Sequence, residues 1–459
     1  MSGPLTDLLP PMPTAQEPDT GPGGTAGVLR VHGRAGRLSG RVTIPGDKSI
    51  SHRAALFGAL AAGTTRIRGF LPANDCLSTL QIVRALGVPV TYSREEVVVE
   101  GRGPDRVAEA ERPLFCGGSG TTMRLLSGIL AGLPFYSILD GNAQLRRRPM
   151  GRVAEPLRRM GATILGRQGG KLAPLSIQGG GLHGIEYATP VPSAQIKSAL
   201  LLAGLFADGT TTVREASPSR DHTERMLAAM GVPVDTRTPG AVSVTRSTLQ
   251  PLTIMVPGDI SSAAFLLCAG AMVPGTEIRL DGVGVNPTRT GVIDVLRAMG
   301  ADIQEAAPRQ EHGEPVADLI VSARPLRGTR IAGALIPRLI DELPVLAVAA
   351  TQAEGVTEVR DAAELRVKET DRIATVAEEL GKLGAHIEPL PDGFRVHGPT
   401  PLHGAAVGSH GDHRLAMALA VAGLVAEGET VVQGSACIDD SYPGFAAALA
   451  ALGAECASD

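Results

Sequence analysis

Aromatic residues are scarce in this chain of 459 residues: tryptophan is absent, and Phe, Trp and Tyr together make up 3%. Its core must therefore be built from Ala, Val, Leu and Ile, within a hydrophobic content of 43%. Few aromatics also disfavour a protein that stacks on nucleic-acid bases. Lys+Arg 43 against Asp+Glu 47 gives a net charge of -4, so no global basic field attracts nucleic acid or an anionic membrane. An anionic ligand must be bound by local groups.

Cysteines are too few and too scattered for a disulfide framework. The five lie far apart, and no two of them have CxxC spacing. This pattern favours a reducing compartment, hence a cytoplasmic protein, and argues against a zinc site. The cysteines are Cys76, Cys116, Cys268, Cys437 and Cys456.

Long apolar runs are also lacking. Because no stretch of 18 uncharged apolar residues occurs, we expect a soluble protein without a membrane partner. Residues 1–26 are rich in Pro and Gly and lack a basic segment followed by an apolar one, which predicts a disordered tail rather than a signal peptide. At ~150 residues per domain, the length predicts two to four domains.

What the sequence does contain is an internal repeat. Six predicted helices end in Leu-Gly or Met-Gly followed by Ala or Val, where glycine supplies the left-handed residue that closes a helix before a strand. Upstream of most of them, an Ala-rich helix is followed by Gly, usually Thr, and an alternating strand. Each unit thus predicts strand, helix, strand, helix, strand, strand over roughly 70 residues. The closing glycines are Gly87, Gly161, Gly231, Gly300, Gly384 and Gly453.

The two halves of the chain also match each other. Residues 44–49 (IPGDKS) resemble residues 256–261 (VPGDIS) at an offset of 212 residues. We therefore predict an α/β protein with two pseudo-symmetric domains of three βαβαββ units each, and chain crossings near both Pro-Gly-Asp turns. The predicted domains are 46–256, and 27–45 plus 257–459, the second completed by the strand that precedes the first turn.

Polar residues mark the starts of the first helices in these units. Lys48 and Arg53 correspond to Ile260 and Phe265 in the matched copy, so the fold alone does not require their charge. A helix N-terminus attracts anions, which favours ligand binding over a merely solvated surface. The glycine-rich turn at 117–120 would let backbone donors approach a phosphate or carboxylate, although such turns are common.

The remaining units begin their helices with other polar groups. Ser193 could be only an N-cap. The carboxylates of residues 341–342 enter a nearly apolar helix, where they could simply complement its dipole. Residues 412–414 (DHR) start the sixth helix, and His410 with His413 forms an HxxH pair that is poor evidence for a metal. If the units are related by rotation, these helix starts converge to form a cleft for a small, multiply anionic ligand.

Two further clusters suit such a ligand. Residues 146–149 (RRRP) could hold an anion or be only a basic loop. Residues 368–372 (KETDR) are predicted to be helical, with Lys368 and Arg372 on one face and Glu369 beside them. Arginine makes two-pronged contacts with phosphate or carboxylate, and a carboxylate among cations can exchange protons with a substrate. Surface ion pairs are the alternative explanation.

Taken in order, these motifs resemble the 5-enolpyruvylshikimate-3-phosphate synthase family over roughly residues 29 to 455. The resemblance implies two domains of three rotated units, an inside-out α/β barrel with the active site in the interdomain cleft. It implies transfer of the enolpyruvyl group of phosphoenolpyruvate to the 5-hydroxyl of shikimate 3-phosphate, in chorismate and aromatic amino acid biosynthesis. It further implies a monomer that uses no metal or organic cofactor. The motifs are PGDKSISHRA, GGSGTTMR, RRRPMGR, PSAQIKSALLLAG, SRDHTERM, IDELPVLAVAA, RVKETDR and GDHRLAMA.

The same resemblance implies roles for individual residues. Asp341 would accept the proton of the 5-hydroxyl, and Glu369 with Lys48 would handle the proton of the enolpyruvyl methylene. The implied shikimate 3-phosphate ligands are Lys48, Ser49, Arg53, Ser193, Ala194, Gln195, Arg220, Asp341 and Lys368. Those implied for phosphoenolpyruvate, whose site glyphosate occupies in this family, are Lys48, Gly120, Arg148, Gln195, Arg372 and Arg414.

Two positions depart from the family pattern. Gly118 stands where Asn is frequent, and Asp440 stands where some members have a Lys that contacts phosphoenolpyruvate. One alternative is the sister enzyme that transfers enolpyruvate to UDP-N-acetylglucosamine, which normally presents a loop Cys; residues 140–150 contain none. Another is a non-catalytic protein that binds phosphorylated ligands, which would need the cations but not Asp341 and Glu369 together.

Overall fold

The computed structural model describes residues 26–33 and 36–459. Its contacts divide the chain into unit 1, Gly46–Val256 with Glu311–Glu314, and unit 2, which holds the described residues up to Pro45 together with Pro257–Gln310 and Pro315–Asp459. The sequence-based boundaries had placed residues 311–314, which form the turn of a β-hairpin, in the C-terminal domain instead. Apart from Ala26, the predicted tail lies outside the described residues. Among those residues, no helix has the length and apolar character needed to span a membrane.

Six sheets, one for each predicted repeat, share a single arrangement. Each contains a parallel pair of strands, one of which also pairs antiparallel with a third strand. In four of the six sheets the parallel pair flanks the first helix along the chain, and in the other two one strand of the pair comes from the other half of the chain. The repeat predicted from the sequence is therefore confirmed. The second repeat shows it in full, with sheet order β6-β7-β9-β8: β6 (Leu114–Phe115), α3 (Gly120–Gly132), β7 (Tyr136–Asp140), α4 (Gly151–Arg159), β8 (Thr163–Gly166) and β9 (Leu172–Gln178).

The other two repeats of unit 1 follow the same order, except that the sheet of the third has three strands. The first contains α1 (Lys48–Leu60), β3 (Ala62–Arg68), α2 (Asn74–Ala85), β4 (Val90–Tyr92) and β5 (Glu96–Arg102). The third contains β10 (Glu186–Ala188), α6 (Ala194–Gly204), β11 (Thr210–Arg214), α7 (His222–Ala229) and β12 (Ala241–Thr245), and is followed by β13 (Thr253–Met255). A short turn of helix, α5 (Arg167–Gly170), lies between β8 and β9.

Unit 2 repeats the pattern three more times. Its first repeat has β2 (Ser39–Thr43), α8 (Ile260–Met272), β14 (Glu277–Gly284), α9 (Gly291–Ala298), β15 (Asp302–Glu311) and β16 (Glu314–Ser322). The next has β17 (Arg330–Ile331), α10 (Ile336–Leu339), α11 (Leu343–Thr351), β18 (Gly355–Val359), α12 (Arg372–Lys382), β19 (His386–Leu390) and β20 (Gly393–Gly398). The last has β21 (Ala406–Gly408), α13 (His413–Gly423), β22 (Glu429–Gln433), α14 (Phe445–Ala451), β23 (Cys456–Ser458) and β1 (Val28–His32).

Strands change sheets at both Pro-Gly-Asp turns. β2 precedes the first turn but pairs in parallel with β14, whereas β13 precedes the second turn and pairs in parallel with β3. The N-terminal strand β1 takes the third place in the last sheet, between β22 and β23. These pairings produce the crossings that the matched halves predicted.

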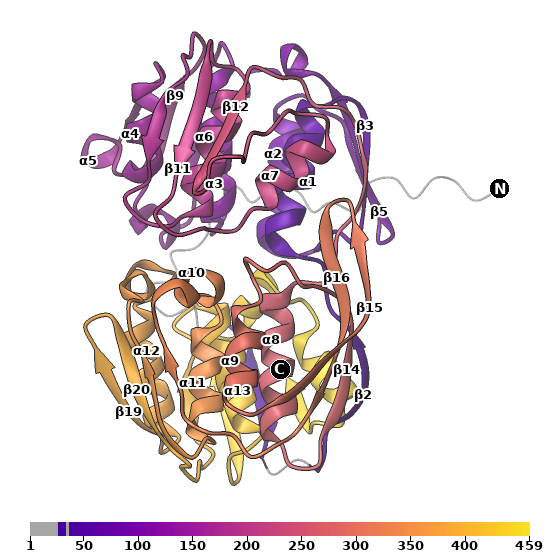
Figure 1. Cartoon of the computed structure of the whole chain (residues 1–459), viewed down its shortest axis with the longest axis vertical. Coiled ribbons are helices and arrows are strands. Elements are labelled where there is room, and N and C mark those ends of the chain that lie inside the picture. Colours follow the sequence, from indigo (N-terminus) through magenta and orange to yellow (C-terminus); the bar gives the residue numbers. More distant parts are fainter. Residues whose placement is uncertain (1–25, 34–35) are drawn as a thin grey trace, which may run out of the picture. The chain divides into compact units, whose positions relative to one another are not determined.

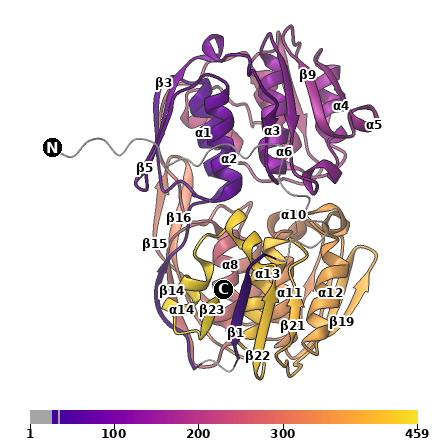
Figure 2. The ribbon, with the colours of Figure 1, turned by 180° about the vertical axis from the view of Figure 1, so that it is seen from behind.

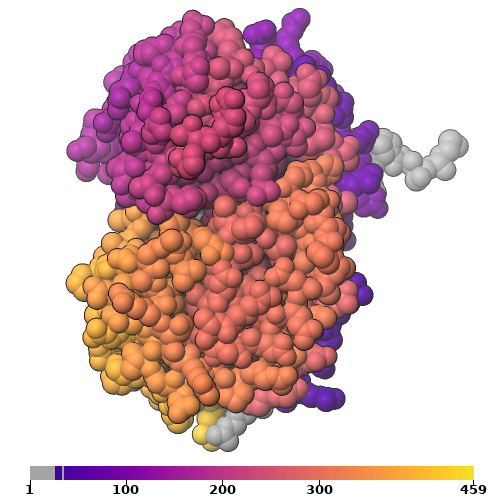
Figure 3. Space-filling view, in the orientation of Figure 1, coloured from indigo at the N-terminus to yellow at the C-terminus, as the bar shows by residue number. Residues whose placement is uncertain are grey.

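Within each unit the first helix of every repeat is central. In unit 2, α8, α11 and α13 pack against one another, and the sheets lie outside them (Figures 1 and 2). Every residue of α8 and α11 is buried, as expected for helices that are apolar on all sides. In unit 1, α3 and α6 approach so closely that a Cβ at Gly128 would lie 2.1 Å from the carbonyl oxygen of Ala199. Side chains fill the spaces between the ribbons of each unit (Figure 3).

The six closing glycines all adopt the left-handed conformation that the sequence predicted. Their φ angles run from +80° at Gly87 to +113° at Gly161. Each glycine thus ends the second helix of its repeat and turns the chain toward the next strand. The polar residues lie instead at the starts of the first helices, where Asp47, Ser119 and Ser193 cap α1, α3 and α6.

Candidate active site

The helix starts of unit 1 carry a set of cations and polar donors, here named half-site 1: the residues at the beginnings of α1, α3 and α6 with the loops beside them. At α1, the carboxylate of Asp47 accepts a hydrogen bond of 2.9 Å from the Ile50 amide and so caps the helix. Lys48 follows at once, and its Nζ lies 2.5 Å from Asp75 Oδ2. Asp75 was not among the residues assigned from the sequence.

Arg53 lies one turn further along α1 and is only 2% exposed. Its guanidinium donates to Thr223 Oγ1 at 2.7 Å, to Ser198 Oγ at 2.8 Å and to the Ser49 carbonyl at 3.0 Å. These acceptors are neutral, so they do not cancel its charge. Burial lowers the pKa of Arg53 to about 10, although the charges of Glu224 and Asp47 oppose the change, and the side chain remains a cation at neutral pH. Arg220 lowers the pKa further. Ser49 and Arg220, both predicted ligands, are therefore near Arg53.

At the start of α3, Gly120 lies against two arginines. A Cβ on Gly120 would lie 2.8 Å from Arg124 Nη1 and 2.9 Å from Arg148 Nη1. Gln195, from the start of α6, donates to Thr121 Oγ1 at 2.9 Å and accepts from Arg124. The structure thus brings together Gly120, Arg148 and Gln195 and adds Arg124, which the i, i+4 spacing from Gly120 could have revealed.

At α6, Ser193 is the N-cap, the purely structural role considered for it from the sequence. Its hydroxyl accepts a hydrogen bond from the Ile196 amide at 3.4 Å. Ala194 opens the helix. Lys197 is buried one turn later, where its Nζ lies 2.7 Å from both Glu215 and Glu224. Burial lowers the pKa of Lys197, but the two glutamates outweigh it and raise the pKa.

This buried lysine has a positioning role that sequence reasoning missed. Lys197 Nζ donates to the Ser219 carbonyl at 3.4 Å, and Glu215 accepts from the Ser219 amide at 3.3 Å. Ser219 directly precedes Arg220, so the pair fixes the loop that carries the predicted phosphate ligand. A lysine two residues after Gln195 in a buried helix was the available clue.

Unit 2 carries half-site 2, a cluster of carboxylates and cations at the starts of α11, α12 and α13. Asp341 Oδ1 lies 3.1 Å from Lys368 Nζ and 3.3 Å from Arg372 Nη1. Arg372 also donates to Glu369 at 2.7 Å. Four of the five residues that the resemblance assigned to this unit, Asp341, Lys368, Glu369 and Arg372, are therefore in contact.

The predicted helix at residues 368–372 is wrong. Lys368 has an extended backbone, and α12 begins only at Arg372. The reason is Asp371, whose carboxylate caps the helix by accepting from the amides of Ile373 and Ala374, each at 3.2 Å. Lys368 and Arg372 meet at Asp341 without sharing a helical face.

Arg372 is fully buried among carboxylates. Its Nε donates to Asp412 Oδ2 at 2.7 Å and its Nη2 to Asp412 Oδ1 at 3.1 Å. Burial by itself lowers the pKa of Arg372, but Asp412, Glu369 and Asp341 outweigh it and raise the pKa. The pKa of Asp412 is lowered: burial opposes the change and the charge of Arg372 overcomes it.

Arg414, in the first turn of α13, joins the same cluster. Its Nη1 donates to the Asp341 carbonyl at 3.4 Å and lies 3.9 Å from Glu342 Oε1. Glu342 is 1% exposed and accepts from Ser261, while its Oε2 has no hydrogen-bond partner among the described residues. The sequence pointed to Glu342 only as a helix-dipole partner.

The HxxH pair does not form a metal site within the described chain. His410 Nε2 lies 2.6 Å from Glu379 Oε1, and the group of potential ligands there is Glu378, Glu379 and His410, without His413. His413 is buried at the start of α13. Asp440, the departure from the family pattern, ends a 3-10 segment at Ser435–Asp440.

A sequence model of the family EPSP synthase (3-phosphoshikimate 1-carboxyvinyltransferase) matches residues 33–449. The chain belongs to the EPSP synthase family. It is 55% identical over 416 residues to the 3-phosphoshikimate 1-carboxyvinyltransferase of Desulforudis audaxviator, covering 90% of this chain and 97% of the relative. With that of Bacillus subtilis it shares 54% over 409 residues, covering 89% and 96%.

Solved structures agree with the fold. An EPSP synthase from Acinetobacter baumannii superimposes with a TM-score of 0.85 at 42% identity, covering 95% of this chain and 100% of that chain. The enolpyruvyl transferase NikO from Streptomyces tendae, at 22% identity and a TM-score of 0.78, supports the fold alone. The predicted two-domain α/β architecture of this family is confirmed.

Proposed function

We propose that half-sites 1 and 2 together carry out the reaction of the EPSP synthase family. The chain transfers the enolpyruvyl group of phosphoenolpyruvate to the 5-hydroxyl of shikimate 3-phosphate and releases phosphate. The observation that carries the proposal is the division of chemistry between the half-sites. Half-site 1 gathers cations at helix starts, among them Arg53 with neutral acceptors, whereas half-site 2 holds the carboxylates of Asp341 and Glu369 against Lys368 and Arg372. A protein that only bound phosphorylated ligands would need the first set but not Asp341 and Glu369 beside Arg372.

Shikimate 3-phosphate is proposed to bind mainly at half-site 1. The backbone amides of Ser193, Ala194 and Gln195, at the start of α6, and the charge of Arg220 suit its phosphate. Lys48, Ser49 and Arg53 suit its carboxylate and hydroxyls. Lys368 of half-site 2 completes the set beside Asp341.

Phosphoenolpyruvate is proposed to bind where arginines gather. Gly120, Arg148 and Gln195, with Lys48, supply one part of its site. Arg372 and Arg414 supply the other. Arg372 would turn toward the substrate through Nη1, because its 3.3 Å bond to Asp341 is longer than its bonds to Glu369 and Asp412.

The proton transfers are assigned to two carboxylates and one amine. Glu369 with Lys48 delivers a proton to the methylene carbon of phosphoenolpyruvate, which leaves a cationic carbon at C2. The 5-hydroxyl attacks that carbon and gives its proton to Asp341. The resulting tetrahedral adduct loses the methyl proton to Glu369 and expels phosphate, which takes up the proton held by Asp341, so the enol ether forms and the carboxylates return to their starting state. These steps balance with no metal or organic cofactor.

We further propose that the protein acts as a monomer in the cytoplasm, on these two small anionic substrates. One chain supplies both half-sites, so no second copy is needed to complete the assigned residues. All five cysteines, which lie in the described part of the chain, are thiols, as is typical of a reducing compartment.

The decisive experiment incubates the full chain with both substrates and follows phosphate release and product mass. The proposal predicts one phosphate for each enolpyruvyl group transferred. A parallel incubation replaces shikimate 3-phosphate with UDP-N-acetylglucosamine, for which we expect no phosphate release. Tight binding without phosphate release would instead identify a binding protein.

A further inference from the structure

A second group of ligand-type side chains lies on the hairpin of β19 and β20, outside both half-sites. His386 and His397 are directly opposite each other in the antiparallel register, and Glu388 lies two residues beyond His386 on the same face. The alternating neighbours Ile387 and Val396 face the other side, where Val396 is fully buried. The three polar side chains therefore share the solvent face of this sheet.

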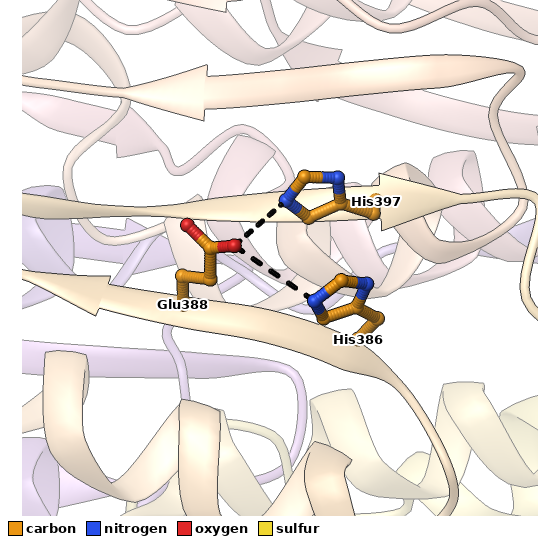
Figure 4. Close-up of side chains that lie close together, drawn as sticks. All are labelled: His386, Glu388 and His397. Atoms are coloured by element: carbon orange, nitrogen blue, oxygen red, sulfur yellow. Dashed lines mark hydrogen bonds and ion pairs between the residues drawn. The ribbon is translucent and has the colours of Figure 1, made fainter.

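The side chains converge on one point (Figure 4). Glu388 Oε1 lies 3.2 Å from His397 Nε2 and 3.8 Å from His386 Nε2, and the three ligand atoms are all within 4.8 Å of one another. The imidazole rings are stacked, with centroids 4.2 Å apart and planes 15° from parallel. Bonds of about 2.0–2.2 Å to a tetrahedral zinc ion place neighbouring ligand atoms about 3.3 Å apart, so little movement is needed to bind one.

The charged residues around His386, Glu388 and His397 do not block the binding of a cation. Arg395 is opposite Glu388 in the register, but its Nη2 is 3.2 Å from Glu358 on the neighbouring strand β18. Among the described residues, the ion pairs of Glu388 are those with the two histidines. With side-chain exposures of 64% for His386 and 34% for His397, an ion can arrive from solvent.

The group at Glu378, Glu379 and His410 differs in this respect. Lys382 Nζ lies 2.7 Å from Glu379 Oε1 and 3.5 Å from Glu378 Oε1, so a cation of the chain itself already occupies that position. Glu379 also accepts from the Gly408 amide at 2.8 Å. This second group is a satisfied ion network and provides a matched control.

We propose that His386, Glu388 and His397 form a surface site for a borderline divalent transition metal ion, with Zn²⁺ as its natural probe. Two imidazoles and one carboxylate suit this class, whereas Mg²⁺ and Ca²⁺ prefer oxygen ligands. The three side chains would occupy three corners and water the fourth. Binding would clamp β19 to β20 by joining side chains from both strands.

The site is separate from the proposed catalysis. Arg372 begins α12, and His386 follows the other end of this helix, whose eleven residues extend roughly 16 Å. Substitutions on the hairpin should therefore leave phosphate release unchanged. Failure of the metal proposal and failure of the proposed function are thus distinguishable.

The test is calorimetric titration of the chelator-treated full chain with ZnCl₂, followed by the same titration of His386→Ala and His397→Ala. We expect at least about a tenfold loss of zinc affinity in each, since even outer ligand partners change affinity by 10–100-fold. His410→Ala should bind zinc like the unchanged protein. Excess Mg²⁺ should not displace the zinc.

A second measurement reports the ligands directly. Co²⁺ should give the absorption of a tetrahedral or five-coordinate complex in the unchanged chain and in His410→Ala, and lose it in His397→Ala. Equal zinc affinity in the unchanged chain and in both hairpin variants would overturn the proposal. So would loss of binding in His410→Ala alone. Thermal unfolding of each variant without metal verifies that its fold is intact.

Discussion

Two arginines show how the half-sites differ. Arg53 and Arg372 are both almost completely buried, each within the first two turns of its helix. Arg53 donates to hydroxyls and a carbonyl, and burial lowers its pKa to about 10. Arg372 donates to three carboxylates, which raise its pKa against the effect of burial. The first charge is available to an anionic ligand, while the second organises acidic groups.

The same contrast appears in the matched helices α1 and α8. Where α1 has Lys48 and Arg53, α8 has Ile260 and Phe265, both buried in the core of unit 2. The Asp47 and Asp259 caps are retained in both, accepting from Ile50 and Ser261. The shared residues build the repeat, and the residues that differ supply the chemistry.

The largest expected effect is a loss of turnover when a carboxylate of half-site 2 is removed. Asp341→Ala should reduce turnover by roughly 100- to 10,000-fold, the range for loss of a general base, because no other group would receive the 5-hydroxyl proton. Binding of shikimate 3-phosphate should persist. Single-turnover phosphate release and calorimetric binding measure the two separately. Turnover close to that of the unchanged enzyme would show that the base is another residue.

The next largest effect is on stability, where substitutions of the two arginines should lower the free energy of unfolding by different amounts. Arg372→Leu leaves Asp412 buried without its cation and should lower the free energy of unfolding by about 3–5 kcal/mol. Arg53→Leu should cost only about 1–2 kcal/mol, because Ser198 and Thr223 still bond each other at 2.6 Å. Denaturant unfolding of both variants compares them. Equal losses would mean that the acceptor type does not decide the cost.

Arg220→Ala tests half-site 1 without a large effect on folding. The variant should weaken shikimate 3-phosphate binding by about 1.5–3 kcal/mol, the range for a hydrogen bond to a charged group. Calorimetry with shikimate 3-phosphate measures the change, and Arg246→Ala, an exposed arginine of unit 1 paired with Asp208, is the control. Affinity loss of equal size in the control would count against a specific role for Arg220.

Gly120→Ala should have a smaller and selective effect. The new methyl would meet Arg124 and Arg148 at 2.8 and 2.9 Å, so these side chains must shift. We expect weaker inhibition by glyphosate, competitive with phosphoenolpyruvate, and some loss of phosphoenolpyruvate affinity. Inhibition constants at varied phosphoenolpyruvate test this. Gly381→Ala, with nothing within 4 Å of its added Cβ, should change neither constant.

The smallest effect is on acid stability. The pKa of Asp412 is lower in the folded chain, so its stabilising contribution is present at neutral pH and is lost as pH falls through that lowered pKa. Asp412→Asn removes this titration and should flatten the fall in unfolding free energy below about pH 4. Unfolding curves at pH 3, 4 and 7 would show it. Parallel pH dependences in both proteins would contradict the assignment.

Much of the fold was predictable because it is repeated. Gly87, Gly161 and their four counterparts marked helix ends by a local conformational need, which does not depend on distant contacts. The Pro-Gly-Asp match likewise predicted where strands change sheets. The helix at Lys368 was wrong because charge spacing cannot show that Asp371 caps a later start.

The sequence by itself determined the repeats, the helix starts, the family and the residue types gathered at each start, since these depend on local patterns and spacing. Only the tertiary structure decided which partner each charge meets. Lys197 positions its neighbouring loop because Glu215 and Glu224 fold against it. Arg372 orders acidic groups because Asp341 and Asp412, which precede other helices, meet it in the folded unit. Such partners are 18 to 40 residues apart in the chain, and burial, which depends on the whole unit, sets the strength of their interaction.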